Sequence, residues 1–170
     1  RTFEEITGKE IRRIHQVPVR FGEAETAVYQ QVIEEFYKMR WNYFQSTGNS
    51  RKDSIMRLIQ QITLLLRISA APNSVAEYIG GTPNKIRKVL SMTEKWDSEI
   101  IAIGVRHEVV LEAYKIAIEE QFPDRPLFVV TGKTTSFAKR RALRKTLRES
   151  GNGILLCTQQ SLPSSVNFEY

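Results

Sequence analysis

The 170-residue chain has little cysteine, proline or glycine and no long apolar run. Its single thiol, Cys157, cannot form an internal disulfide, which excludes a cysteine-stapled mini-protein and fits a reducing compartment. The longest apolar run, 62–68, contains Thr63 and Arg67 and is far shorter than the roughly 20 residues of a membrane-spanning helix. Residues 1–10 carry three acidic residues and no apolar stretch, unlike a secretory signal peptide. We therefore expect an intracellular globular protein with no membrane partner.

Residue patterns that carry catalysis are also scarce. His15, His107 and Cys157 lack metal-ligand spacing, so we expect them in the core or on the surface. Gly132-Lys133-Thr134 matches the end of a Walker A phosphate loop, but the motif's first glycine would fall at Leu127, inside an apolar run of strand length. That leaves no room for a loop around phosphates. A small-molecule α/β enzyme is accordingly the weakest of the functional interpretations.

The positive charge is concentrated in one window of the sequence. The net charge is +6, yet residues 133–148 hold seven basic residues and no acidic one, so the remainder has 18 basic and 19 acidic residues. A solvated face is the ordinary explanation of a charge run, but such faces normally mix signs. The window therefore predicts contact with a polyanion such as nucleic acid. At helical spacing its basic residues share one arc, beside Leu143 and Leu147: Arg140, Arg141, Arg144, Lys145 and Arg148.

Hydrophobic periodicity changes at the pair Gly80-Gly81. An extended or β segment at 14–21 is expected first, then two amphipathic helices, 23–44 and 54–69, joined by a turn over 46–52 into an antiparallel hairpin. After the pair, a helix capped by Thr82, with Pro83 at its first position, runs to about Trp96. The rest alternates: strand 100–105, helix 108–121, strand 127–131, helix 136–150 and strand 154–158. This order predicts an α/β fold with an N-terminal helical hairpin and a parallel three-stranded βαβαβ unit.

Three sets of side chains are expected to be buried by these elements. The first is the inward face of helix 108–121 and the second an apolar stripe on helix 54–69. The third is a group of aromatics expected in the core or in a contact between lobes, with base stacking as the minor alternative. The face of helix 108–121 consists of Val109, Val110, Ala113, Ile116 and Ala117. The stripe on helix 54–69 consists of Ile55, Leu58, Ile59, Ile62, Leu65 and Leu66. The aromatics are Phe36, Tyr37, Trp41, Tyr43 and Phe44.

Several segments, taken in order, carry a family resemblance. Residues 17–36 (VPVRFGEAETAVYQQVIEEF) read as a short strand and a helix containing a tyrosine, and 64–73 (LLLRISAAPN) as a leucine-rich helix ending at a proline. With 99–105 and 154–167 (ILLCTQQSLPSSVN), which resemble motifs IV and V, the chain resembles the middle of a Swi/Snf-family helicase-like ATPase of superfamily two. The resemblance implies that 1–80 are the helical end of the first RecA-like lobe with its protrusion helices. It implies that 81–170 are a truncated second RecA-like lobe of helicase C-terminal type.

This resemblance implies a fragment of an ATP-dependent DNA translocase, a hydrolase that uses ATP and Mg²⁺ when complete. The fragment would contribute DNA-backbone contacts and part of the inter-lobe ATP site, with double-stranded DNA and the missing remainder of the two lobes as partners. It would act in the cytoplasm or nucleoid, or in the nucleus of a eukaryote. The residues implied to bind nucleic acid are Lys133, Thr134, Thr135, Arg140, Arg141, Arg144, Lys145 and Thr158, and those implied to bind nucleotide are Ser165 and Asn167.

The sequence departs from the family at the parts that hydrolyse ATP. Walker A, Walker B and motif VI are absent, so no catalytic residue is assigned and the chain alone is expected neither to hydrolyse ATP nor to bind it tightly. The glycines of motif V are replaced within 160–165, which removes the residues that allow close backbone approach to phosphate. A non-enzymatic helical–α/β module that binds nucleic acid or protein through the basic helix stays open as the alternative.

A sheet of three strands also predicts how the chain behaves in solution. Its open edge would leave backbone groups unpaired and would expose side chains near Ile154 and Leu156, while the hairpin helices would cover one face. We therefore expect self-association through the open sheet edge, or mobile ends after Leu162.

Overall fold

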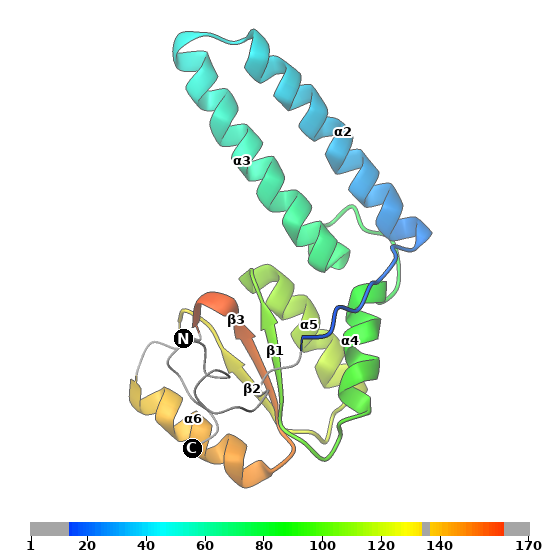
Figure 1. Ribbon diagram of the computed structural model, residues 1–170, viewed down its shortest axis with the longest axis vertical. Helices are drawn as coiled ribbons and strands as arrows, with labels where there is room; N and C mark the ends of the chain where they lie inside the picture. Colours follow the sequence, from blue (N-terminus) through cyan, green and yellow to red (C-terminus); the bar gives the residue numbers. More distant parts are fainter. Residues whose placement is uncertain (1–13, 134–136, 162–170) are drawn as a thin grey trace.

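The computed structural model describes residues 14–133 and 137–161, which form a helical hairpin and an α/β unit (Figure 1). The predictions made for Thr134, Thr135, Ser165, Asn167 and the segment after Leu162 fall outside the described residues, as does the side chain of Arg140. Within them, the predicted α/β class with a parallel three-stranded sheet is confirmed.

The hairpin consists of α2 (Glu23–Gln45) and α3 (Gly48–Ala70), preceded by an extended segment at 14–22. The turn predicted over 46–52 is much shorter, because α3 already begins at Gly48. Contacts with the end of α2 override the turn-forming residues there. The guanidinium of Arg51 lies 4.9 Å from the ring centre of Tyr43, and the hydroxyl groups of Ser46 and Ser54 are 3.2 Å apart.

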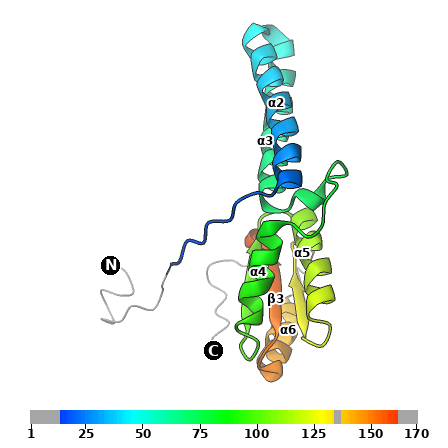
Figure 2. The same cartoon turned by 90° about the vertical axis from the view of Figure 1, so that its right-hand side faces the viewer.

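The hairpin projects away from the sheet and does not cover it, contrary to expectation (Figures 1 and 2). Its small core consists of Val28, Val32 and Ile68, with half-buried neighbours that include Leu64 and Leu65. The core burial expected for its outer apolar side chains is therefore wrong, while the other expectation for the aromatics, a contact between lobes, stays a prediction. Large apolar side chains remain exposed on both helices: Tyr37, Trp41 and Phe44 on α2, and Ile55, Ile59, Ile62 and Leu66 on α3.

A buried carboxylate ties the base of the hairpin to α4 (Asn84–Glu94). One oxygen of Glu25 accepts a hydrogen bond from the backbone N–H of Gly22, and the other accepts one from the backbone N–H of Asn84 at 2.8 Å. The ammonium of Lys85 donates to the carbonyl of Ser69 at 2.9 Å. Residues far apart in the sequence thus fix the start of α4, where Pro83 rather than Thr82 occupies the N-cap position.

The α/β unit continues with elements that lie within one or two residues of their predicted bounds. They are β1 (Ile101–Val105), α5 (Glu108–Gln121), β2 (Leu127–Val130), α6 (Phe137–Ser150) and β3 (Ile154–Thr158); two short 3₁₀ turns, η1 (Pro72–Ser74) and η2 (Gln159–Ser161), complete the described structure. The sheet is parallel in the order β1-β3-β2, with Ile154 opposite both Ile101 and Leu127.

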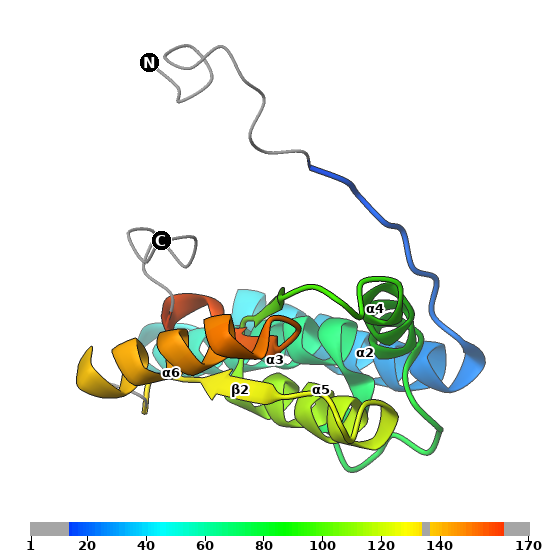
Figure 3. The same cartoon turned by 90° about the horizontal axis from the view of Figure 1, so that it is seen from below.

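The central position of β3 explains why its side chains are buried on both faces of the sheet. Ile154 and Leu156 belong to the core shared with α4 and α5, whereas Leu155 and Cys157 pack beneath α6. Figure 3 looks along the sheet and shows α6 on one side with α4 and α5 on the other. The expected exposure near Ile154 and Leu156 is wrong, because both side chains are 0% exposed.

The face that α5 turns to the sheet differs from the predicted one. Val110 and Ala117 are buried as expected, but Val109 and Ile116 are 46% and 52% exposed. The buried set is completed by Leu111, Tyr114 and Ile118, whose spacing of three and four residues defines the packed stripe. Apolar residues of α5 lie around most of its circumference, so the sequence pattern does not determine which face packs on the sheet.

Two features stabilise the loops at the end of the sheet where the strands begin. Gly151 ends α6 with a φ of 72°, the left-handed conformation in which glycine is favoured. Arg125 donates four hydrogen bonds to backbone carbonyls, at 2.6 Å to Asn152, 3.1 Å to Thr93, 2.9 Å to Trp96 and 2.6 Å to Glu99. One guanidinium thereby joins the C-terminal end of α4 to the loops before β1 and β3.

Candidate nucleic-acid interface

Polar and basic side chains meet at the carboxyl edge of the sheet. Arg106 and His107 follow β1 directly, Lys133 follows β2 within a few residues, and Thr158 ends β3. Because the strands are parallel, these positions lie at one edge, and α5 and α6 both begin there (Figure 1). In open α/β sheets this edge is where ligands bind.

A pocket of about 600 Å³ opens at this edge. The first turn of α5 lies in its wall, with His107 as the N-cap residue. The backbone N–H groups of the first helical turn have no intrahelical acceptor, so they and the helix dipole favour an anion. All three strand ends contribute to the lining, which consists of Arg106, His107, Glu108, Gly132, Thr158, Gln160 and Ser161.

An ion pair lies at this edge of the sheet. The ammonium of Lys133 lies 3.2 Å from a carboxylate oxygen of Glu108, and both side chains are largely exposed. An exposed pair of this kind contributes only about 0–1 kcal/mol to stability. The lysine predicted to contact phosphate is therefore placed at the edge, where a phosphate oxygen can replace the carboxylate as its partner.

The imidazole of His107 is the most perturbed group of the pocket. Desolvation by burial, then the charges of Arg106 and Arg67, lower the pKa of His107, so the ring is neutral at pH 7. Its Nε2 atom is buried and has no hydrogen-bond partner among the described residues. Sequence reasoning assigned His107 to the core or surface and passed over Arg106. Their position immediately after a buried parallel strand is the signal that could have identified both.

Thr158 lies at the edge, but its hydroxyl is occupied within the chain. The side chain is buried, and its oxygen shares a hydrogen bond with the hydroxyl of Ser161, the last residue of η2. The neighbouring Cys157 points to the α6 side of the sheet and its thiol donates to the carbonyl of Ile103 at 3.6 Å. Burial raises the pKa of Cys157, whose side chain lies in the core, one of the two places expected for it.

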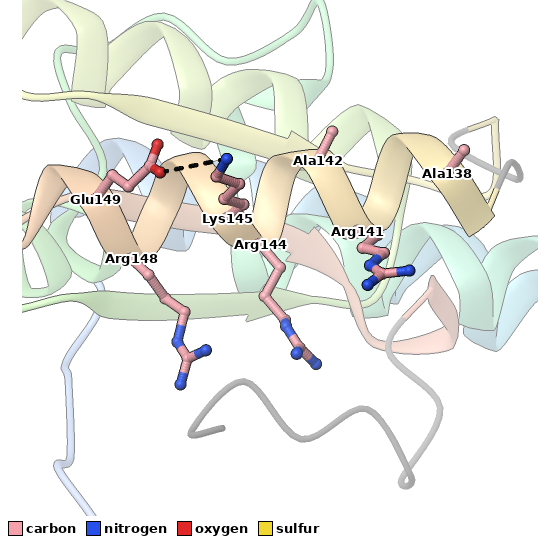
Figure 4. A pocket seen from close by; sticks show the side chains of 7 residues that line it. All are labelled: Ala138, Arg141, Ala142, Arg144, Lys145, Arg148 and Glu149. Atoms are coloured by element: carbon pink, nitrogen blue, oxygen red, sulfur yellow. Dashed lines mark ion pairs between the residues drawn. The ribbon is translucent and has the colours of Figure 1, made fainter.

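Helix α6 places the predicted basic face on the surface. Leu147 is buried and Leu143 half-buried against β2 and β3, as the spacing predicted. Figure 4 shows Arg141, Arg144 and Arg148 projecting from the same side of the helix. Lys145 instead turns toward Glu149, with its ammonium 3.8 Å from a carboxylate oxygen. A surface hollow of about 750 Å³ follows this helix, lined by these five residues with Ala138 and Ala142.

The described residues give no sign of a metal centre. Nowhere among them do three or more His, Cys, Asp or Glu side chains gather in a way that could hold an ion. Among the helices of the described part, none is sufficiently long and apolar to cross a membrane.

Comparison with known proteins identifies the fold. No protein-family model matches the sequence, and a search of curated proteins gives no match. Solved structures do match: the Sulfolobus solfataricus SWI2/SNF2 ATPase C-terminal domain superposes with a TM-score of 0.63 at 14% identity, covering 85% of this chain and 62% of that one. The Sulfolobus solfataricus SWI2/SNF2 ATPase core in complex with dsDNA gives 0.59 at 15% identity, covering 82% of this chain and 30% of that one. The chain thus has the fold of a SWI2/SNF2 ATPase C-terminal domain, as the sequence resemblance predicted.

Proposed function

We propose that this chain is part of an ATP-dependent DNA translocase and contributes contacts to the DNA backbone. The observation that carries the proposal is the carboxyl edge of the sheet, where Arg106, Lys133 and the start of α5 meet on a SWI2/SNF2-like fold. The fold is shared with a SWI2/SNF2 ATPase core that was solved in complex with dsDNA, which supports duplex DNA as the ligand. A DNA-bound protein of this kind would act in the nucleoid or cytoplasm, or in a eukaryotic nucleus.

The chemistry of the edge suits phosphate groups rather than bases. Arginine binds phosphate through paired N–H donors, lysine provides a point charge, and the first turn of α5 provides backbone N–H groups. On α6, Arg141, Arg144 and Arg148 project to one side and extend the basic surface. Phosphate contacts are the same for every sequence, so binding should be tolerant of sequence and should weaken steeply with salt.

The roles of ATP and Mg²⁺ belong to the complete protein. Glu108 is the one carboxylate among the described residues that line the pocket and it is paired with Lys133; a single carboxylate held by a cation does not fit a magnesium site. Ser165 and Asn167, which the family resemblance places at the nucleotide, lie outside the described residues. We expect no catalytic residue in this chain, and no ATP hydrolysis or tight ATP binding by the chain alone.

Duplex binding by the purified chain tests the proposal. We expect the logarithm of the association constant to fall with the logarithm of salt concentration, with a slope of about −4 to −5 for about five phosphate contacts. Arg141→Glu with Arg144→Glu should abolish binding while the circular-dichroism spectrum is unchanged. Lys52→Glu with Arg57→Glu, on α3, is the matched control because it makes the same change in net charge away from the edge. Equal loss in both double variants would reduce the basic face of α6 to a solvated surface.

The alternative, a non-enzymatic module that binds nucleic acid or protein through the basic helix, predicts the same DNA affinity but a different parent protein. The two are separated by DNA-stimulated phosphate release from a longer protein that includes both RecA-like lobes. Stimulated hydrolysis that is lost with Arg141→Glu and Arg144→Glu would support the translocase. Absence of hydrolysis in that longer protein would support the binding module.

A further inference from the structure

The pocket at the carboxyl edge of the sheet contains an acidic side chain, although it is proposed to bind phosphate. Glu108 is the first residue of α5 and lines the pocket beside Arg106. Its carboxylate lies 3.2 Å from the ammonium of Lys133, and its side chain is 48% exposed, so a ligand can reach it. A site that had only to attract phosphate would be weakened by this charge, because like charges repel.

Glu108 lies where an anion is favoured. Helix α5 has 14 residues, and the N–H groups of its first turn, which have no intrahelical acceptor, favour negative charge together with the helix dipole. Lys133 adds a positive charge at the same point. The carboxylate therefore interacts with the groups that would otherwise hold a ligand phosphate. Glu108 is an internal competitor of the ligand.

The charges at the pocket sum to a small positive value. Arg106 is exposed and takes part in none of the ion pairs among the described residues, whereas Lys133 is paired with Glu108. His107 is neutral at pH 7, because desolvation and the charges of Arg106 and Arg67 lower its pKa. The other lining residues carry no charge. Two positive charges and one negative charge leave a net charge of +1.

A net charge of +1 matches one phosphate of a nucleic-acid backbone. A phosphodiester carries a single negative charge, whereas a phosphomonoester carries about −1.5 to −2 at pH 7. The attraction of the pocket grows in proportion to the charge of the ligand, but the cost of removing an ion from water grows with the square of its charge. In a weakly positive pocket, the second charge of a phosphomonoester therefore adds more cost than attraction.

We propose that this pocket binds a single phosphodiester group and that Glu108 excludes phosphate groups of higher charge. The inference rests on the proposed function, since it concerns the pocket through which the chain is proposed to contact DNA. On binding, a phosphate oxygen replaces the carboxylate beside Lys133, and the exposed carboxylate turns to solvent. The pocket thus selects the interior of a strand over a terminal phosphate, free phosphate or a nucleotide.

Two small probes of different charge test this selectivity: diethyl phosphate, a phosphodiester, and ethyl phosphate, a phosphomonoester. Amide NMR shifts at the start of α5 report their binding to the purified chain at pH 8 and low, constant ionic strength. We expect the unchanged chain to bind ethyl phosphate no more tightly than diethyl phosphate. Glu108→Gln should raise the affinity about threefold for diethyl phosphate and about tenfold for ethyl phosphate, because doubling the ligand charge doubles the Coulomb energy and squares the factor.

Two further variants separate the charge of the pocket from general effects. Glu112→Gln is the matched control, because Glu112 lies one turn later on α5 and pairs with Lys115, also at 3.2 Å. This variant makes the same change in net charge and should alter either affinity less than twofold. Lys133→Gln combined with Glu108→Gln returns the pocket to a net charge of +1. The double variant should therefore bind ethyl phosphate no more tightly than diethyl phosphate, as the unchanged chain does.

Equal rises for the two probes in Glu108→Gln, or no rise, would overturn the proposal. A tenfold preference of the unchanged chain for ethyl phosphate would do so as well, as would the absence of shifts at α5 with either probe. Duplex binding by the same samples distinguishes this failure from that of the proposed function. Salt-dependent duplex binding that persists beside any of these results rejects the selectivity alone. Loss of duplex binding beside the expected selectivity rejects the DNA contact and retains the phosphodiester pocket.

Discussion

The α/β unit and the hairpin bury their residues in opposite ways. All five residues of β3 are buried, on both faces of the sheet, whereas α2 and α3 have 23 residues each and bury only a few at their contact. The α/β unit therefore has a core of its own, and its surface is free to carry charge. The hairpin has a thin core and an apolar outside, so its residues are arranged for contact with something beyond themselves.

The largest expected effect comes from removing a central core side chain. Leu156→Ala should lower the free energy of unfolding by about 4 kcal/mol, because the site is fully buried and a cavity would remain. Val32→Ala in the hairpin removes two methyl groups from a thin core and should cost about 1–2 kcal/mol. Urea unfolding measures both variants. A Val32→Ala cost as large as that of Leu156→Ala, although fewer carbon atoms are removed, would show that the hairpin core is packed at least as well as the core of the α/β unit and would contradict the comparison.

Arg125 should rank next, since it stabilises the α/β unit by polar contacts alone. Arg125→Ala removes four hydrogen bonds to backbone carbonyls and should cost about 2–3 kcal/mol, less than the sum of the bonds because water can reach part of this site. Arg125→Lys provides the comparison, because a single ammonium cannot reproduce the planar fork of donors. If Arg125→Lys were as stable as the unchanged chain, positive charge near α4 rather than the four hydrogen bonds would account for the stabilisation.

A smaller effect is expected from the alkaline titration of Tyr114. Desolvation by burial raises the pKa of Tyr114 to about 12. The folded state then retains the proton that the unfolded state loses near pH 10, so this stabilisation is present below pH 10 and is lost as the pH rises toward 12. At pH 11 the loss should be about 1.4 kcal/mol relative to pH 8. Unfolding curves of Tyr114→Phe at both pH values should lack this difference, and identical losses in the two proteins would show that Tyr114 is solvated.

Sequence predicted the α/β unit well because its elements are short and strongly patterned. Continuous apolar runs such as 154–158 indicate buried strands, and the alternation of strand and helix indicates a parallel sheet, but the central place of 154–158 in that sheet was not predicted. The burial of side chains in the hairpin was harder to predict. Its helices were predicted, but the exposure of Tyr37, Trp41 and Ile59 was not, because periodicity identifies an apolar face without telling what covers it.

The candidate site was predicted in part for a similar reason. Charge density selected α6, and the packing of Leu143 and Leu147 confirms how that helix is seated. Charge density could not select Arg106 or His107, which are isolated in the sequence and gain significance from the neighbouring strand ends. Nor could it show that Lys133 pairs with Glu108, because that contact joins the residues after β2 to the start of α5, 25 residues earlier in the sequence. The division of the chain at residues 80 and 81 into two lobes stays a prediction.

Hydrogen exchange of the chain with and without duplex DNA tests the central claim most directly, because it reads both regions in one measurement. The claim is that the carboxyl edge and α6 contact DNA while the hairpin does not. We expect DNA to slow exchange at the start of α5, around Lys133 and in the first half of α6, and to leave α2 and α3 unchanged. Protection confined to the hairpin, with none at the strand ends, would contradict the account.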